Sequence, residues 1–135
     1  MVHTWDPQTY LRYAAERGRP FVELLARVGA EDPRLVVDLG CGPGTLTELL
    51  AKRWPDARVV GVDSSARMIE QAQALRRPEP AGRAGARGQL SFELGDVRSW
   101  EPDAAVDVII SNAALQWIPD HLELLPRLVE RLASG

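Results

Sequence analysis

Three glycines alternate along the stretch DLGCGPGT, residues 38–45, and their spacing is the strongest chemical signal in the chain. Gly40, Gly42 and Gly44 carry no side chains, so a ligand can come close to their backbone. The stretch follows an apolar run and precedes a helix-like segment, whose first N–H groups have no partners within the helix. A plain tight turn is the alternative explanation, but it does not need three alternating glycines. We therefore predict a ligand-binding loop at 38–45.

The glycine spacing also indicates the kind of ligand. A dinucleotide-binding fingerprint has the pattern G-x-G-x-x-G, whereas this loop has G-x-G-x-G with an acidic residue, Asp38, two positions before its first glycine. This difference weakens the case for a bound pyrophosphate. It also argues against a nicotinamide-dependent reductase.

Two further aspartates follow apolar runs that resemble strands. Asp63 lies about twenty residues beyond the loop, where a carboxylate can accept both hydroxyls of a ribose. Its alternative role is to cap the helix that follows. Asp96, in the triplet GDV, is placed to accept a hydrogen bond from the exocyclic amine of a base, although Gly-Asp is also common in turns. Together these residues predict a site for a nucleoside-containing ligand.

The elements that must position these residues follow an alternating pattern. Apolar, β-branched runs predict strands at 34–40, 57–63, 90–96 and 106–112. Helices are expected to begin near Asp6, Pro20, Thr45, Ser64 or Ser65, and Asp120. The alternation predicts βαβ units and an α/β fold with a doubly wound parallel sheet. Ligands of such sheets bind at the carboxyl ends of the strands, where the glycine loop and both aspartates fall.

Four of the five predicted helices, all but the one near Asp6, place their apolar side chains on one face, which we expect to be buried. The four sets are Phe21, Leu24, Leu25 and Val28; Leu46, Leu49 and Leu50; Met68, Ile69, Ala72 and Leu75; and Leu125, Leu128, Val129 and Leu132. Pro126 is expected to kink or restart the last helix, because proline lacks the N–H that a helix needs.

Composition and charge narrow the possible partners. A net charge of −3 gives no reason to expect a nucleic acid or an anionic membrane, so a small molecule is the expected partner. The sequence has no apolar run long enough to cross a bilayer and no signal-peptide pattern at its start, so we expect a cytoplasmic protein. The low-complexity segment 76–88 predicts a flexible loop.

Cysteine and histidine usage excludes two kinds of site. Cys41 is the only cysteine, so the chain cannot form an internal disulfide. His3 and His121 share no metal-ligand spacing, and we predict no metal. No nearby histidine can activate Cys41 as a nucleophile, so we interpret it as a small residue that offers its backbone N–H.

Four segments together resemble the successive motifs of class I S-adenosylmethionine-dependent methyltransferases: VVDLGCGPGTLTELLA, the strand-ending Asp63, LGDV, and VDVIISNAALQWIPD. The resemblance implies a Rossmann-like sheet that binds S-adenosylmethionine and releases S-adenosylhomocysteine. It implies that Asp38 and the glycine loop embrace the methionine part, that Asp63 holds the ribose, that Asp96 meets the adenine, and that Asn112 faces the reacting methyl group. We also assign Cys41, Ser64, Met68 and Val97 to the cofactor site.

Two segments near the ends of the chain, TWDPQTYLRYAAERGRPFVELLARV and SNAALQWIPDHLELLPRLV, resemble the branch of this family that esterifies a carboxylate of trans-aconitate, a small unsaturated tricarboxylic acid. That branch continues past the residue matching Gly135 and completes a seven-stranded sheet. The resemblance therefore implies that residues 1–135 form the N-terminal part of a methyltransferase domain with about four of the seven strands. Within it we predict a helical lid segment at 1–30, a βαβ core at 34–135, and an open sheet edge capable of self-association.

The chemistry implied by this resemblance needs no general base. A carboxylic acid with a pKa of about 4 is already ionised at neutral pH. We therefore nominate no catalytic residue and expect Gln116 and Trp117 only to orient the substrate. Arginine binds carboxylates bidentately, so basic and aromatic residues of the N-terminal segment are the candidate substrate ligands: Tyr10, Arg12, Tyr13, Arg17 and Arg19. Two alternatives stay open, namely another small-molecule methyltransferase of this fold and a non-catalytic fragment that binds S-adenosylmethionine.

Overall fold

The computed structural model describes residues 18–75, 89–112, 118–119 and 121–133. Its helices are α2 (Arg19–Ala26), α3 (Thr47–Arg53), α4 (Ala66–Leu75) and α5 (His121–Glu130), and its strands are β1 (Leu35–Leu39), β2 (Arg58–Asp63), β3 (Leu90–Leu94) and β4 (Val108–Ile110). The chain divides into two compact units, 1–31 and 32–135. The predicted first helix near Asp6 and the loop at 76–88 lie outside the described residues.

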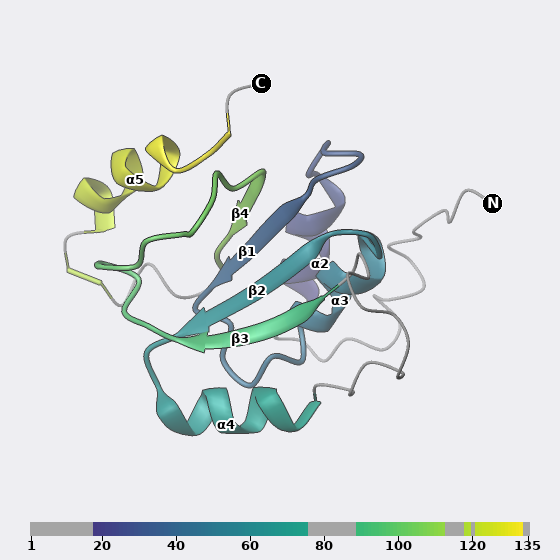
Figure 1. Cartoon of the computed structure of the whole chain (residues 1–135), viewed down its shortest axis with the longest axis horizontal. Helices are drawn as coiled ribbons and strands as arrows, with labels where there is room; N and C mark the ends of the chain where they lie inside the picture. The colour runs from purple at the N-terminus through teal and green to yellow at the C-terminus, as the bar shows by residue number, and fades with distance from the viewer. Residues whose placement is uncertain (1–17, 76–88, 113–117, 120, 134–135) are drawn as a thin grey trace. The chain divides into compact units, whose positions relative to one another are not determined.

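The second unit is built on a parallel sheet, as the sequence predicts, and its four strands lie in the order β3-β2-β1-β4 (Figure 1). The pairing register aligns Asp38 with Gly61 and Gly61 with Phe92. These three residues therefore lie side by side across β1, β2 and β3. Every residue of β1 is buried, as expected for a strand covered on both faces.

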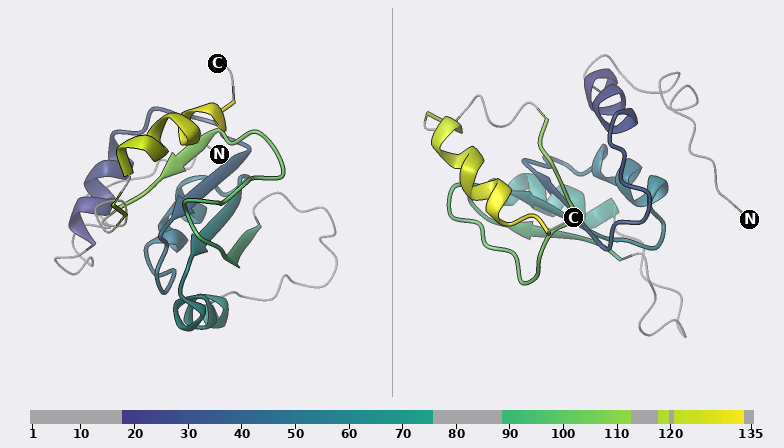
Figure 2. Two further views of the ribbon diagram at one scale, coloured as in Figure 1. Left: turned by 90° about the vertical axis from the view of Figure 1, so that its left-hand side faces the viewer. Right: turned by 90° about the horizontal axis from the view of Figure 1, so that it is seen from above.

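Helices cover the two faces of this sheet. On one face, Leu124 and Leu128 of α5 join a buried cluster with alternate residues of β1 and β2, including Val37 and Val60. On the other face, Ile69 and Ala72 of α4 pack with Phe92 and Cys41. Figure 2 shows α4 and α5 on opposite sides of the sheet. The sheet thus has the doubly wound arrangement that the alternation of strands and helices predicts.

The first unit contains α2, which begins where the sequence predicts. Gly18 is its N-cap residue and a proline occupies its first turn. Its buried side chains are Phe21, Val22 and Leu25. Leu24 is 40% exposed, so its predicted place on the buried face is wrong.

Helical spacing also misassigned parts of the other buried faces. In α3, Leu50 is fully buried, whereas Leu46 and Leu49 are only half-buried. In α4, Ile69 and Ala72 are buried but Met68 is exposed. In α5, the buried pair is Leu124 and Leu128, while Leu125 and Val129 are exposed, as is the predicted Leu132 just after the helix. Spacing identifies an apolar arc, but the neighbouring element decides which part of the arc is covered.

Helix α5 and strand β4 differ from the sequence prediction. Helix α5 runs through Pro126, so the predicted restart at this residue is wrong. Strand β4 covers 108–110 only, and Val106 instead forms a parallel bridge with Leu132 after α5. β4 is an edge of the sheet within the described residues. None of the helices in the described ranges is long and apolar enough to span a membrane.

Candidate functional site

The glycine loop connects the end of β1 to α3, and all three of its glycines have left-handed backbone conformations. The φ angles are 78° at Gly40, 58° at Gly42 and 80° at Gly44. A Cβ atom on Gly42 would meet nothing within 4 Å, so this position borders open space. A Cβ atom on Gly44 would lie 2.7 Å from the ring of Phe92. Gly42 thus leaves room above the loop, while Gly44 lets the loop rest on β3.

The loop's backbone N–H groups are used inside the protein. Gly40 and Cys41 both donate to the carbonyl oxygen of Val62, at 2.7 and 3.0 Å. Gly44 donates to the carbonyl of Cys41 at 3.2 Å. The N–H of Cys41 thus extends the hydrogen bonding between β1 and β2, and the place of Cys41 in the cofactor site stays a prediction.

Asp38 is a buried carboxylate at the end of β1, with 3% of its surface exposed. The Thr47 hydroxyl, which is fully buried at the start of α3, donates a hydrogen bond to Asp38 Oδ2 at 2.8 Å. Burial raises the pKa of Asp38 from its ordinary 3.8 to about 6; the Thr47 bond opposes this rise and the negative charge of Asp63 adds to it. The loop therefore covers a carboxyl group that titrates just below neutral pH.

Asp63 ends β2 and connects two loops. Its Oδ2 atom accepts a hydrogen bond from the N–H of Gly42, and its Oδ1 atom accepts one from the N–H of Ser65, both at 2.9 Å. Ser65 in turn caps α4, because its hydroxyl oxygen accepts a bond from the N–H of Met68 at 3.3 Å. Each carboxylate oxygen keeps a second lone pair, so these bonds are compatible with the predicted ribose contacts.

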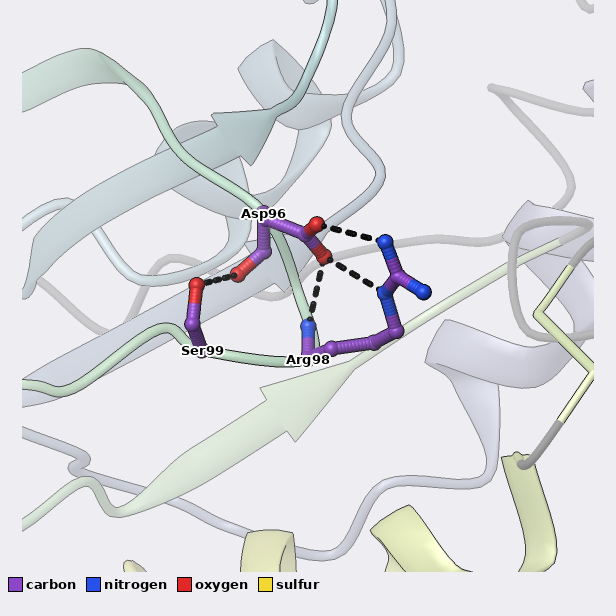
Figure 3. Close-up of polar contacts among 3 residues, drawn as sticks. All are labelled: Asp96, Arg98 and Ser99. Carbon is purple, nitrogen blue, oxygen red and sulfur yellow. Dashed lines mark hydrogen bonds and ion pairs between the residues drawn. The ribbon is translucent and has the colours of Figure 1, made fainter.

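Asp96 follows β3, and its pKa is shifted in the opposite direction from that of Asp38. Its Oδ1 accepts bonds from the backbone N–H of Arg98 at 2.9 Å and from Arg98 Nε at 3.3 Å, and its Oδ2 accepts one from the guanidinium at 3.0 Å (Figure 3). The hydroxyl of Ser99 donates to the Asp96 carbonyl. These bonds from Arg98 lower the pKa of the exposed Asp96 carboxyl. The group predicted to meet an adenine amine is thus engaged by a neighbouring arginine.

Several residues that shape the site were missed by sequence reasoning. Thr47 holds Asp38, and Gly61 makes room for Phe92, since a Cβ atom on Gly61 would lie 2.7 Å from that ring. The hydroxyl of Ser111 donates to the carbonyl of Leu39 at 2.9 Å and so ties the end of β4 to the end of β1. A glycine inside a strand was the available signal for Gly61. Thr47 and Ser111 carried none.

The remaining predicted residues fall into three groups. Ser64 and Met68 are exposed, and Asn112 is half-buried just after β4. Val97 is buried in the core cluster of the α5 face, and Arg19 is exposed at the start of α2 in the first unit. The others lie outside the described residues: Tyr10, Arg12, Tyr13, Arg17, Gln116 and Trp117.

The Cys41 thiol lies near the carboxylates of Asp38 and Asp63 and is affected by the charge of both. Burial raises its pKa to about 12, and the charges of Asp38 and Asp63 add to the rise. A thiol with this pKa stays protonated at neutral pH and is a poor nucleophile. In the described part of the chain, no three or more His, Cys, Asp or Glu residues are grouped to hold a metal ion.

Residues 36–135 match the family model described as a methyltransferase domain. The chain is 50% identical over 134 residues to a trans-aconitate 2-methyltransferase of Streptomyces coelicolor, covering 98% of this chain and 43% of that protein. It therefore spans less than half the length of this relative.

Solved structures share the fold. An S-adenosylmethionine-dependent methyltransferase from Mesorhizobium loti has a TM-score of 0.69 and 25% identity, covering 90% of this chain and 51% of that one. The plantazolicin methyltransferase BpumL, solved with a monoazolic desmethylPZN analog and S-adenosylhomocysteine, has a TM-score of 0.60 and 25% identity, covering 75% of this chain and 35% of that one. The region that matches this chain is thus only part of each of these two larger structures.

Proposed function

We propose that this chain binds S-adenosylmethionine at the carboxyl ends of β1 and β2. The chain belongs to the family of class I S-adenosylmethionine-dependent methyltransferases, and this membership is the premise of the proposal. The methyl group goes to a carboxylate of a small polycarboxylic acid. trans-Aconitate is the proposed acceptor, because the Streptomyces coelicolor relative is named for that reaction. The observation that carries the binding proposal is the glycine loop, which the carbonyl of Val62 and the carboxylate of Asp63 hold from below.

The residues present fit this ligand. Open space borders Gly42, and carboxylates stand on two sides of the loop: Asp38 for a cationic group and Asp63 for hydroxyl groups. The plantazolicin methyltransferase BpumL was solved in complex with S-adenosylhomocysteine. We assign the methionine part to Asp38, Gly40, Gly42 and Gly44, the ribose to Asp63, and the adenine to Asp96 once Arg98 shares or releases its carboxylate.

S-Adenosylmethionine, when bound, supplies an electrophilic methyl carbon on a sulfonium. A carboxylate acceptor is ionised at neutral pH, so no residue of this chain has to remove a proton. The protein's task is to hold the two reactants together and exclude water, which in favourable cases lowers a barrier by about 7 to 11 kcal/mol. Asn112, just after β4, is the proposed neighbour of the reacting group. The substrate roles of Arg19 and of the N-terminal tyrosines and arginines stay predictions.

The test is calorimetric titration of the 135-residue chain with S-adenosylhomocysteine, with NAD as the competing nucleotide. We expect saturable binding of S-adenosylhomocysteine and none of NAD. Asp63→Asn keeps one acceptor oxygen for the loop but loses the charge, and it should weaken binding at least about tenfold. Asp103→Asn is the matched control, because Asp103 is exposed and, within the described residues, pairs only with Arg58 at the start of β2.

Methyl transfer is then assayed with trans-aconitate, other small acids and a phenol. Turnover of trans-aconitate would support the full proposal. Turnover of another acceptor would favour a different small-molecule methyltransferase, and binding without turnover would favour a cofactor-binding fragment. A folded, monomeric chain that fails to bind S-adenosylhomocysteine would contradict the proposal itself.

A further inference from the structure

We propose that Thr47 is a positioning residue that keeps Asp38 ionised and correctly oriented for a cationic group of the ligand. This inference rests on the proposed function, because it concerns the same loop. It is carried by the hydrogen bond from the Thr47 hydroxyl to Asp38 Oδ2, which joins the first residue of α3 to the end of β1 across the loop.

The burial of both partners makes this bond chemically significant. Thr47 is fully buried and Asp38 is 3% exposed, so water cannot replace the hydroxyl as a donor. Within the described residues, Asp38 makes no other side-chain hydrogen bond. Valine has nearly the same shape as threonine and would fill the same space, so packing alone does not require the hydroxyl. The hydroxyl's distinctive contribution is the hydrogen bond to Asp38.

The charges around Asp38 show why a donor is needed. Desolvation and the negative charge of Asp63 both favour the protonated acid, while the Thr47 bond favours the carboxylate. Among the described residues, the titratable groups that interact with Asp38 are Asp63 at the end of β2 and the Cys41 thiol in the loop. That thiol is neutral at physiological pH, and no positive charge is among the described groups that shift the pKa of Asp38. Among the described residues, Thr47 is therefore the only partner that stabilises the ionised form of Asp38.

This arrangement makes ligand affinity depend on pH. A ligand ammonium gains from Asp38 only when Asp38 is ionised, so affinity should fall as the pH drops through about 6. Loss of the Thr47 bond should move this fall to higher pH. A hydrogen bond to a charged group corresponds to a shift of about one to two pH units.

The experiment measures the dissociation constant of S-adenosylhomocysteine from about pH 5 to about pH 8.5 for the wild type, Thr47→Val and Thr47→Ser. Thr47→Val should shift the midpoint of the affinity loss upward by about one to two pH units, and Thr47→Ser should restore it to near the wild-type value. A uniform weakening by Thr47→Val at every pH, with no shift, would overturn the proposal and leave Thr47 a packing residue.

A second measurement separates this proposal from the proposed function. The pKa of Asp38 is followed by the carbon-13 NMR signal of its carboxyl group in the ligand-free chain. Thr47→Val should raise this pKa and Thr47→Ser should not, whether or not the chain binds S-adenosylhomocysteine. An unchanged pKa in Thr47→Val would refute the role of Thr47, whereas a raised pKa in a chain that binds no ligand would refute only the cofactor assignment.

Discussion

Asp38 and Asp96 are the same residue type at the same kind of position, just before or after the carboxyl end of a parallel strand, yet their surroundings differ. Asp38 is buried, meets one neutral hydroxyl, and has a pKa raised to about 6. Asp96 is exposed, accepts three hydrogen bonds from Arg98, and has a lowered pKa. A strand-ending aspartate in a sequence therefore predicts where a carboxylate lies but not its charge at a given pH.

The difference follows from the neighbours of each strand. β1 is internal to the sheet and its end is covered by the glycine loop and α3, so Asp38 loses its water. Within the described residues β3 is an edge strand, and the segment after it leaves the Asp96 side chain in solvent beside Arg98. The β1 end stores an unfavourable charge that a cationic ligand can relieve, whereas the β3 end has already satisfied its charge.

Cys41 gives the largest expected effect at the buried end. With its pKa raised from 9.0 to about 12, the thiolate fraction at neutral pH falls by about a thousandfold. We expect iodoacetamide to alkylate the native chain at least about a hundredfold more slowly than the urea-unfolded chain. The rate is measured by mass spectrometry. Comparable rates in a chain shown to be folded would mean that the loop is open and the contrast with β3 is false.

Asp38→Asn should remove the charge penalty of the buried end. Asp38 has a folded pKa above its unfolded value, so it costs nothing well below pH 4 and progressively destabilises the fold as the pH rises to about 6. The rise from 3.8 to about 6 corresponds to about 3 kcal/mol. We therefore expect the variant to unfold at higher urea concentration at neutral pH while losing affinity for S-adenosylhomocysteine.

The control for this experiment is Asp103→Asn, which should leave the pH dependence of unfolding nearly unchanged because Asp103 is exposed. Equal stability of wild type and Asp38→Asn at neutral pH would show that the carboxylate is better solvated than its burial suggests.

Gly44→Ala tests the steric side of the same end. The substitution forces a left-handed backbone on alanine and places a methyl group 2.7 Å from the Phe92 ring, so we expect a loss of about 2 kcal/mol in the free energy of unfolding. Gly29→Ala is the matched control, because a Cβ atom there meets nothing within 4 Å and its φ is not left-handed. Chemical denaturation measures both. Losses of equal size would show that the contact with Phe92 does not constrain the loop.

Arg98→Ala should have the smallest effect on stability, because the ion pair with Asp96 is exposed. We expect the free energy of unfolding to change by less than about 1 kcal/mol. The pKa of Asp96 should rise, since the lowering hydrogen bonds are lost, and NMR titration of its carboxyl group would detect this. The stabilisation lost is present above the ordinary aspartate pKa and disappears on acidification in the wild type. A pKa that stays low would indicate that another group holds Asp96.

The sequence predicted the sheet well because its signal is local. The run at 34–40 is short, β-branched and apolar on both alternating faces, which is typical of a strand covered on both sides. The faces of the helices were less predictable. Leu24 and Leu125 lie in apolar arcs, but their burial depends on a neighbour that the sequence spacing does not identify.

The candidate site shows the same division. The glycine loop and the strand-ending aspartates were found because each motif is continuous in sequence. Gly61 was not, because its importance arises from the register that places it between Asp38 and Phe92. The Thr47 bond likewise needs α3 to return over β1, which is a tertiary fact. Whether these residues bind S-adenosylmethionine is what the titrations above decide.

The carbonyl oxygen of Val62 accepts hydrogen bonds from the N–H groups of both Gly40 and Cys41, and this affects the kinetics of ligand binding. A glycine-rich loop that were free in solution would have to be ordered at each encounter, which slows association and reduces affinity. Here the loop is already joined to the β1–β2 ladder, so its conformational entropy is lost during folding rather than during binding. The amide hydrogens of Gly40 and Cys41 should accordingly exchange with solvent as slowly as those of the central strands, and ligand should enter a surface that is already formed.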